Sequence, residues 1–149
     1  MFSEVSKLIF TIAPINDPPV ISSISDQEIN EDTQLNLELI ASDPDGDYLT
    51  FTSENTGNSF LSITGNQLSL QPEQNFNGEF NVTINVSDGE YIDSTEFSVI
   101  VLPVNDPPVL IGIIDSLTVL EGAEDLEIQL SEIFFDVENG SDLNYSVSE

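Results

Sequence analysis

The chain contains no cysteine and no histidine, and its single basic residue is Lys7. Without cysteine and histidine it can form no disulfide, no thiolate nucleophile and no ordinary zinc site. A Ser-His-Asp triad is excluded for the same reason. Any bound metal must therefore be a hard cation that takes oxygen ligands.

Positive charge is almost absent, while Asp and Glu together number 28 and the formal net charge is -27. Phosphate binding needs a basic footprint, so this charge argues against nucleic acid as a partner, and it disfavours an anionic membrane surface. Crowded negative charge also weakens a compact state unless cations or salt neutralise it. Two explanations stay open: an acidic surface suited to a secreted or saline setting, and bound divalent metal.

The first 15 residues carry a short apolar run, but Glu4 precedes it and no small-residue cleavage site follows. We therefore interpret this segment as neither a signal peptide nor a membrane span, and we expect no direct membrane insertion.

A six-residue phrase occurs twice, as INDPPV at residues 15–20 and as VNDPPV at residues 104–109. Alignment on these phrases also matches the apolar alternation that precedes each of them. A repeat of this length indicates whole domains in tandem rather than a solenoid. The predicted division is the last strand of a preceding repeat with its linker at residues 1–15, a complete repeat at 16–104, and a linker with the first half of another repeat at 105–149.

The segment between the two phrases contains only strand patterns. Apolar and polar residues alternate in seven runs, and no run shows helical spacing over two turns. The runs are residues 20–24, 34–42, 48–53, 59–64, 67–72, 79–87 and 95–103. Seven short strands, each polar on one side, predict an all-β fold built as a two-sheet antiparallel sandwich.

An odd number of antiparallel strands places the two termini at opposite ends of the sandwich and sends successive loops to alternate ends. The incoming linker, residues 43–47 and residues 87–90 therefore share one end, which we name the incoming pole. Residues 30–33, residues 72–78 and the outgoing linker share the other end, the outgoing pole.

Acidic and amide side chains gather at both poles. The incoming pole holds Asn16, Asp17, Asp43, Asp45, Asp47 and Asp88. The outgoing pole holds Glu31, Asp32, Glu73, Asn75, Asn105 and Asp106, and the following unit adds Asp136, Glu138 and Asp142. Alignment of the two units pairs Asp43 with Asp136, Asp45 with Glu138 and Asp47 with Asp142.

Carboxylates crowded at one junction repel each other by several kcal/mol unless cations lie between them. Calcium accepts six to eight oxygen ligands in flexible geometry, which suits Asp-rich loops better than the octahedral demand of magnesium. Each motif also has an ordinary explanation, because residues 43–47 form a common turn sequence and Asn-Asp-Pro-Pro is a common linker. The convergence of these acids at the same junctions favours calcium, with the prolines holding each linker extended.

In their order along the chain, these motifs resemble the cadherin-like tandem repeats of large bacterial surface proteins. The resemblance implies Greek-key sandwich domains, of the immunoglobulin or cadherin kind, in an extracellular adhesin with Ca²⁺ at its interdomain junctions. The ligands that it implies are Asn16, Asp17, Asn105 and Asp106 in the linkers, Asp43, Asp45, Asp136 and Glu138 in the acidic loops, and Glu31 and Asp88. Asp47 joins them from the incoming pole. The chain departs from cadherin linkers at Pro14 and Pro103, where those linkers carry a further Asp.

The function that we predict is a non-enzymatic segment of an extracellular rod, stiffened by calcium, that serves adhesion or projection from a cell surface. Its partners would be neighbouring repeats, a second copy of the protein, or a glycan or protein on another surface. Two alternatives stay open. One is a carbohydrate-binding accessory domain of a secreted polysaccharide-degrading enzyme, and the other is a metal-free structural spacer or lattice subunit.

Overall fold

A computed structural model describes residues 13–55, 57–113, 121–122, 128–140 and 142–146 of the 149-residue chain. The predicted strand at residues 8–12 lies outside these ranges. The strands are β1 (Val20–Ile21), β2 (Gln27–Asn30), β3 (Leu35–Glu38), β4 (Ala41–Ser42), β5 (Thr50–Asn55), β6 (Ser59–Thr64), β7 (Gln67–Pro72), β8 (Gly78–Ser87), β9 (Ile92–Leu102), β10 (Val109–Leu110) and β11 (Phe134–Phe135). One 3-10 helix, η1, spans Leu130–Glu132.

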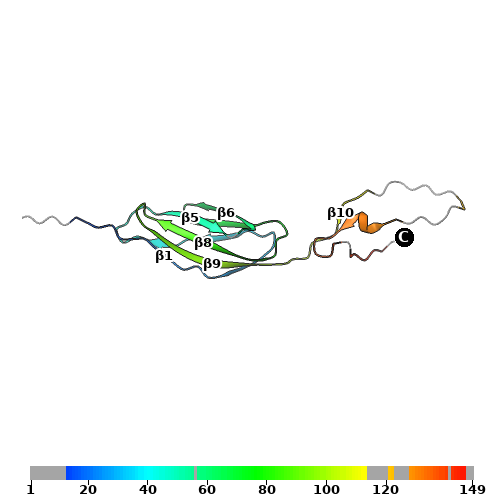
Figure 1. Cartoon of the computed structure of the whole chain (residues 1–149), viewed down its shortest axis with the longest axis horizontal. Helices are drawn as coiled ribbons and strands as arrows, with labels where there is room; N and C mark the ends of the chain where they lie inside the picture. Colours follow the sequence, from blue (N-terminus) through cyan, green and yellow to red (C-terminus); the bar gives the residue numbers. More distant parts are fainter. Residues whose placement is uncertain (1–12, 56, 114–120, 123–127, 141, 147–149) are drawn as a thin grey trace, which may run out of the picture.

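The strands of the complete repeat form two main sheets, as the sequence predicts. One sheet has the order β2-β9-β8-β5, and the other has the order β3-β7-β6. The strands run along the length of the repeat, so the chain enters at one end and leaves at the other (Figure 1). This arrangement confirms the prediction of an all-β sandwich.

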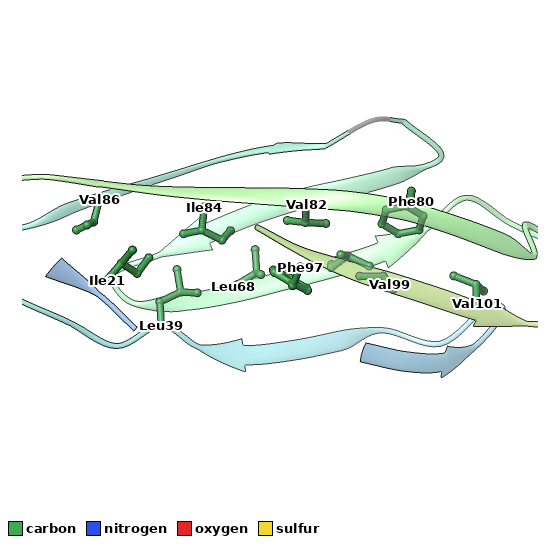
Figure 2. Packing of buried hydrophobic residues seen from close by; sticks show 11 residues of the cluster. Ile21, Leu39, Leu68, Phe80, Val82, Ile84, Val86, Phe97, Val99 and Val101 are labelled. Atoms are coloured by element: carbon green, nitrogen blue, oxygen red, sulfur yellow. The ribbon is translucent and has the colours of Figure 1, made fainter. Parts of the chain in front are cut away.

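Alternating apolar residues of β7, β8 and β9 fill the space between the sheets. Figure 2 shows side chains of this layer, and the residues that it labels on these strands are Leu68, Phe80, Val82, Ile84, Val86, Phe97, Val99 and Val101. Leu70 belongs to the same buried cluster. Full burial of one such side chain stabilises the fold by about 1.5–3 kcal/mol. The core therefore holds both poles at a fixed separation.

The first predicted strand, residues 20–24, was wrong in its extent. Of these residues only Val20 and Ile21 lie in a strand, β1, which pairs with β4. A strand that the sequence analysis did not predict, β2, follows at residues 27–30 and pairs in parallel with β9, although only antiparallel pairing was predicted. Side-chain carboxylates explain the division: Ile21 donates its backbone N–H to Asp93 at 2.9 Å, and Ser98 donates its own to Asp26 at 2.8 Å. These acceptors satisfy backbone groups where the chain crosses from one sheet to the other.

The second predicted strand, residues 34–42, is also interrupted, between β3 and β4. Leu39 donates its N–H to the carbonyl of Asn66 at 2.8 Å, and the carbonyl of Ile40 accepts the N–H of Ser22 at 2.8 Å. The chain thus leaves one strand partner and takes another, which brings residues 43–47 to the end of the sandwich where the linker enters.

The second unit repeats part of this pattern. β10 pairs with β11 in an antiparallel ladder that joins Val109 to Phe135, as β1 joins Val20 to Ser42 through β4. In both units the acidic loop begins at the residue that follows this ladder, Asp43 or Asp136. The division of the chain into repeats at residues 15 and 104 stays a prediction.

Candidate metal centre

The loop of residues 43–47 is organised around one carboxylate oxygen. Asp43 Oδ1 accepts the backbone N–H groups of Asp45 at 2.9 Å and of Asp47 at 3.1 Å. Gly46 lies between them with φ of 81°, a conformation that glycine adopts without strain. One carboxylate oxygen from each of Asp43, Asp45 and Asp47 lies within 4.8 Å of the others. The loop therefore turns three negative groups toward one point.

The other carboxylate oxygen of Asp43 has no donor. Asp43 Oδ2 is buried and receives no hydrogen bond from the described residues. A buried carboxylate oxygen without a partner is costly, because it has lost its hydration and gained nothing in return. Two unit charges about 4 Å apart near a protein surface repel each other by about 4 kcal/mol in addition. A cation bound there would offset both the lost hydration and the repulsion.

The incoming linker is fastened to this loop and to its neighbour. Asp17 donates its backbone N–H to Asp45 Oδ2 at 2.8 Å. Asn16 donates from Nδ2 to Asp88 Oδ2 at 2.9 Å, which leaves its Oδ1 as an acceptor in the same region. Residues 14–16 line a hollow of about 370 Å³ together with Asp45 and Asp47. The incoming pole therefore brings all six of its predicted residues together.

Asp88 is held in its ionised form by the turn that follows it. Its Oδ1 accepts the backbone N–H groups of Tyr91 and of Glu90, each at 2.7 Å. These bonds, that of Tyr91 foremost, together with the bond from Asn16, lower the pKa of the Asp88 carboxyl below its usual value. An ionised carboxylate is the form that a metal ion needs.

At the outgoing pole, Glu31 ties the departing linker to the sandwich. Its side chain is buried, and its Oε1 accepts the backbone N–H of Val104. Its own N–H bonds to the carbonyl of Leu102 at 2.9 Å. Glu31 is therefore not the solvated acid that its position in a polar turn suggests. Its carboxylate bonds to the linker, and its role as a calcium ligand stays a prediction.

Two further polar residues contribute to the outgoing pole. Asp32 Oδ1 accepts the backbone N–H of Asn75 at 3.1 Å, and both residues adopt positive φ, 57° and 58°. Asp and Asn tolerate this left-handed conformation better than other side chains do. Both residues line a hollow of about 360 Å³ that also includes Asp106 and Val137. The pole thus receives side chains from both units, as strand parity predicts.

The acidic loop of the second unit repeats the arrangement around Asp43. Asp136 is buried, and its Oδ1 accepts the backbone N–H groups of Glu138 at 3.1 Å and of Asn139 at 2.8 Å. These bonds, that of Asn139 foremost, lower the pKa of the Asp136 carboxyl. Asp106 donates its backbone N–H to Glu138 Oε1 at 3.3 Å, as Asp17 does to Asp45.

The pairing of Asp142 with Asp47 was wrong. Asp142 is exposed and donates its backbone N–H to the carbonyl of Asn139. At residues 43–47 three acidic side chains lie close together, and the described part of the second loop contains no such group. Asn139 takes the place near the loop carboxylate, where its Nδ2 donates to Asp136 Oδ1 at 3.0 Å. An Asn followed by Gly140 signals such a turn in the sequence.

Asn105, a predicted ligand in the outgoing linker, bonds to its neighbour in the chain. It is exposed, and its Nδ2 donates to the carbonyl of the adjacent Asp106 at 2.9 Å. Its role as a calcium ligand stays a prediction, as do the roles of the other candidate ligands. Hydrogen bonds between protein groups do not test metal binding.

Residues 16–100 match a known family, the bacterial Ig domain. The chain belongs to this family. Bacterial Ig domains are typically extracellular or surface modules and are generally non-enzymatic. The matched span begins at Asn16, in the incoming linker, and ends at Ile100, within β9. The family match therefore covers the incoming pole of this bacterial Ig domain, but it stops before the outgoing linker.

Solved structures with some likeness to this bacterial Ig chain come from different kinds of protein. Human protocadherin-24 EC1-2 is 24% identical over 59% of this chain and 44% of its own, with a TM-score of 0.47. The endo-fucoidan hydrolase MfFcnA4 from glycoside hydrolase family 107 is 26% identical over 62% of this chain and 16% of its own, with a TM-score of 0.45. The titin M3 domain is 15% identical over 56% and 96%, with a TM-score of 0.42.

The bacterial Ig chain spans less than half of the length of the protocadherin fragment that it resembles. No sequence among the curated proteins matches it. Within the described residues, no helix has the length and the apolar character that a membrane crossing needs.

Proposed function

We propose that this chain is a calcium-binding segment of an extracellular rod, in which calcium at the junctions between consecutive repeats stiffens the linkers. The observation that carries the proposal is Asp43 Oδ2, which is buried and accepts no hydrogen bond from the described residues, in a loop where carboxylate oxygens of Asp43, Asp45 and Asp47 lie within 4.8 Å of one another. The rod would serve adhesion or spacing at a cell surface, with neighbouring repeats as its first partners.

The residues of the incoming pole fit a calcium ion in number and in kind. Carboxylates from Asp43, Asp45, Asp47 and Asp88 and the amide oxygen of Asn16 would supply oxygen ligands, and Asp17 would add another from the linker. Calcium commonly takes six to eight such ligands from loops. Bound there, the ion would neutralise the repulsion among these side chains, which the protein's own groups leave uncompensated.

Calcium would also join the linker to the folded repeat. In the structure this joint consists of the bonds from Asp17 to Asp45 and from Asn16 to Asp88. Single hydrogen bonds of this kind contribute about 0.5–1.5 kcal/mol each, so alone they hold a linker weakly. An ion that bridges linker and loop carboxylates would turn a flexible joint into a stiff one.

At the outgoing pole the same role would fall to residues of two units. Glu31 and Asp106 would act from the complete repeat and its linker, and Asp136 and Glu138 from the next unit. The repeated bond from the linker backbone to the second acid of the loop supports an equivalent joint. A rod built this way would carry one stiffened junction per repeat.

Small-angle scattering on the whole chain tests this proposal. We expect the maximum dimension and the radius of gyration to increase when calcium replaces a chelator, because the junctions straighten. Magnesium at the same concentration serves as the control ion, and it should have a smaller effect. Identical scattering profiles with calcium and with chelator would contradict the proposal and favour a metal-free spacer.

A further inference from the structure

The two main sheets leave four strands at their edges, and these strands differ in charge. β2 and β5 flank one sheet, and β3 and β6 flank the other. β2 carries Glu28, β3 carries Glu38 and β5 carries Glu54, whereas β6 carries no charged residue. Proteins commonly place charge on edge strands to prevent the pairing of their open backbone groups with another chain. β6 lacks this protection.

The uncharged character extends well beyond β6. Residues 55–72 contain no Asp, Glu, Lys or Arg, in a chain with a net charge of -27. They form most of the β6–β7 hairpin, whose outward side chains are mainly Ser, Thr and Gln. Phe60 stands among them with 69% of its surface exposed. This side of the repeat is therefore a neutral face on an acidic molecule.

The outer edge of β6 is open beyond Ser59, whose carbonyl accepts a hydrogen bond from Asn55 Nδ2 at 2.9 Å. Glu73 donates its N–H to the carbonyl of Asn58 at 2.9 Å, just before β6 begins. This bond shows which residues of β6 direct their backbone groups at β7. In an antiparallel ladder, every second residue directs both backbone groups at the partner strand. Residues 60, 62 and 64 therefore bond to β7, while Leu61 and Ile63 direct their N–H and carbonyl groups outward. β6 pairs with no other strand in the described part of the chain.

We propose that β6 pairs with β6 of a second copy of this chain, antiparallel and across a two-fold axis. The occupant is a second copy because two molecules of this charge repel each other least where both lack acidic side chains, and residues 55–72 are such a face. The strand is also self-complementary in one register. With Ser62 on the axis, Leu61 faces Ile63 of the partner and can exchange hydrogen bonds with it, and Phe60 packs against the partner's Thr64.

The pairing joins two three-stranded sheets into one continuous sheet. β6 runs along the length of the repeat at its margin (Figure 1), so an antiparallel pair aligns two copies in opposite directions. Copies that project from two facing surfaces would meet in this orientation. The pairing involves neither acidic pole, so it does not depend on calcium, and its failure would leave the proposed function untouched.

Disulfide trapping tests the register directly, because the chain has no cysteine of its own. In Ser62→Cys, the two cysteines face each other in a pair that is not hydrogen-bonded, where Cα atoms lie about 4.5 Å apart, within the range that a disulfide accepts. We expect mild oxidation to convert most of this variant to a covalent dimer. Asn36→Cys, on the outward face of edge strand β3, is the matched control and should stay monomeric. Equal dimer formation by the two variants, or none by Ser62→Cys, would overturn the proposal.

Sedimentation equilibrium tests the association without a cross-link. The mass of the unaltered chain should rise from 16.3 kDa toward twice that value with concentration. Ser62→Glu and Ser62→Lys should both remain monomeric, because each places two like charges on the axis, whereas Thr52→Glu on β5 should associate as the unaltered chain does. If Ser62→Lys strengthens association, the effect is one of net charge and the strand pairing is wrong. A chain that stays monomeric up to about 1 mM also overturns it.

Discussion

The two poles of the complete repeat use the same linker contact in different settings. At the incoming pole, one folded unit supplies the whole acidic loop, and three of its carboxylates lie within 4.8 Å of one another. At the outgoing pole, the buried Glu31 belongs to one unit, while Asp136 and Glu138 belong to the next. Among the described residues, the candidate ligands of the incoming pole lie in one unit and its linker, and those of the outgoing pole lie in two units.

This difference suggests how calcium affinity would differ between the two poles of this chain. Ligands held in place by one stable core are already ordered before calcium binds, so binding there loses little conformational entropy. Ligands from two units must first be brought together, and that ordering lowers the affinity. We therefore expect the incoming pole to bind calcium more tightly than the outgoing pole. The following predictions test this ranking, from the largest expected effect to the smallest.

Asp43→Asn should have the largest effect. Asparagine keeps an oxygen that can accept the backbone bonds from Asp45 and Asp47, but it replaces the unpartnered oxygen with an amide donor. We expect the calcium affinity of the tighter sites to fall about 100-fold, the upper end of the loss seen when a metal's surroundings are disturbed. Isothermal titration calorimetry measures this. Asp32 is an exposed acid at the other pole, so Asp32→Asn is the control. It should leave the calcium affinity of the tighter sites unchanged.

Calcium should raise the melting temperature of the complete repeat. A ligand at 100 times its Kd stabilises the folded state by about 2.7 kcal/mol. In a domain of about 85 residues, that gain corresponds to roughly 10–20 °C. Differential scanning calorimetry with calcium and with chelator measures the shift. The Asp43→Asn variant should lose most of it, and a shift of full size in that variant would place the stabilising ion elsewhere.

Asp106→Ala should affect the outgoing junction alone. The substitution removes the linker carboxylate but keeps the backbone N–H that bonds to Glu138. We expect roughly a tenfold loss in the weaker class of calcium sites, with the melting temperature of the complete repeat unchanged. Titration calorimetry and scattering together measure this. An unchanged calcium affinity of the weaker sites would show that Asp106 is not a ligand.

A smaller effect should follow from the lowered pKa of Asp88. A carboxyl whose folded pKa lies below its unfolded value adds stability above the unfolded pKa, about 3.9, and this stability is lost as the pH falls through the folded pKa. Without calcium, the contribution of Asp88 to the stability should therefore be lost as the pH falls below the unfolded pKa. Asp88→Asn should remove this contribution, and an identical pH profile of the melting temperature in the variant would contradict the assignment.

Asp142→Asn should change calcium binding least. Alignment equates this residue with Asp47, but its backbone N–H bonds to the carbonyl of Asn139, whereas that of Asp47 bonds to the loop carboxylate. We expect both classes of site to keep their affinities within error. A clear loss in the weaker class would mean that the second loop rearranges around the ion.

The sequence was sufficient to predict the sandwich and the composition of its poles, because both follow from alternation and from strand parity. Val82, Ile84 and Val86 mark the buried face of β8 by spacing alone, and parity correctly joined Asn16 to Asp88 across 72 residues. Neither inference depends on local backbone detail.

The sequence could not reveal features that depend on individual hydrogen bonds. The division of the first strand depends on carboxylates from Asp26 and Asp93, which look like ordinary surface acids. The burial of Glu31 and the unpartnered oxygen of Asp43 are consequences of how the chain packs at each end. The misplaced Asp142 has the same origin, since one altered turn changes which side chain reaches Asp136.

The most direct test of the account is a crystal structure of the whole chain grown with abundant calcium. We predict an ion at the incoming pole with Asp43 Oδ2 and oxygens of Asp45 and Asp88 about 2.3–2.6 Å from it, confirmed by anomalous scattering when a lanthanide replaces calcium. Water alone beside Asp43 Oδ2, with the three carboxylates turned apart, would contradict the claim that a cation holds this junction.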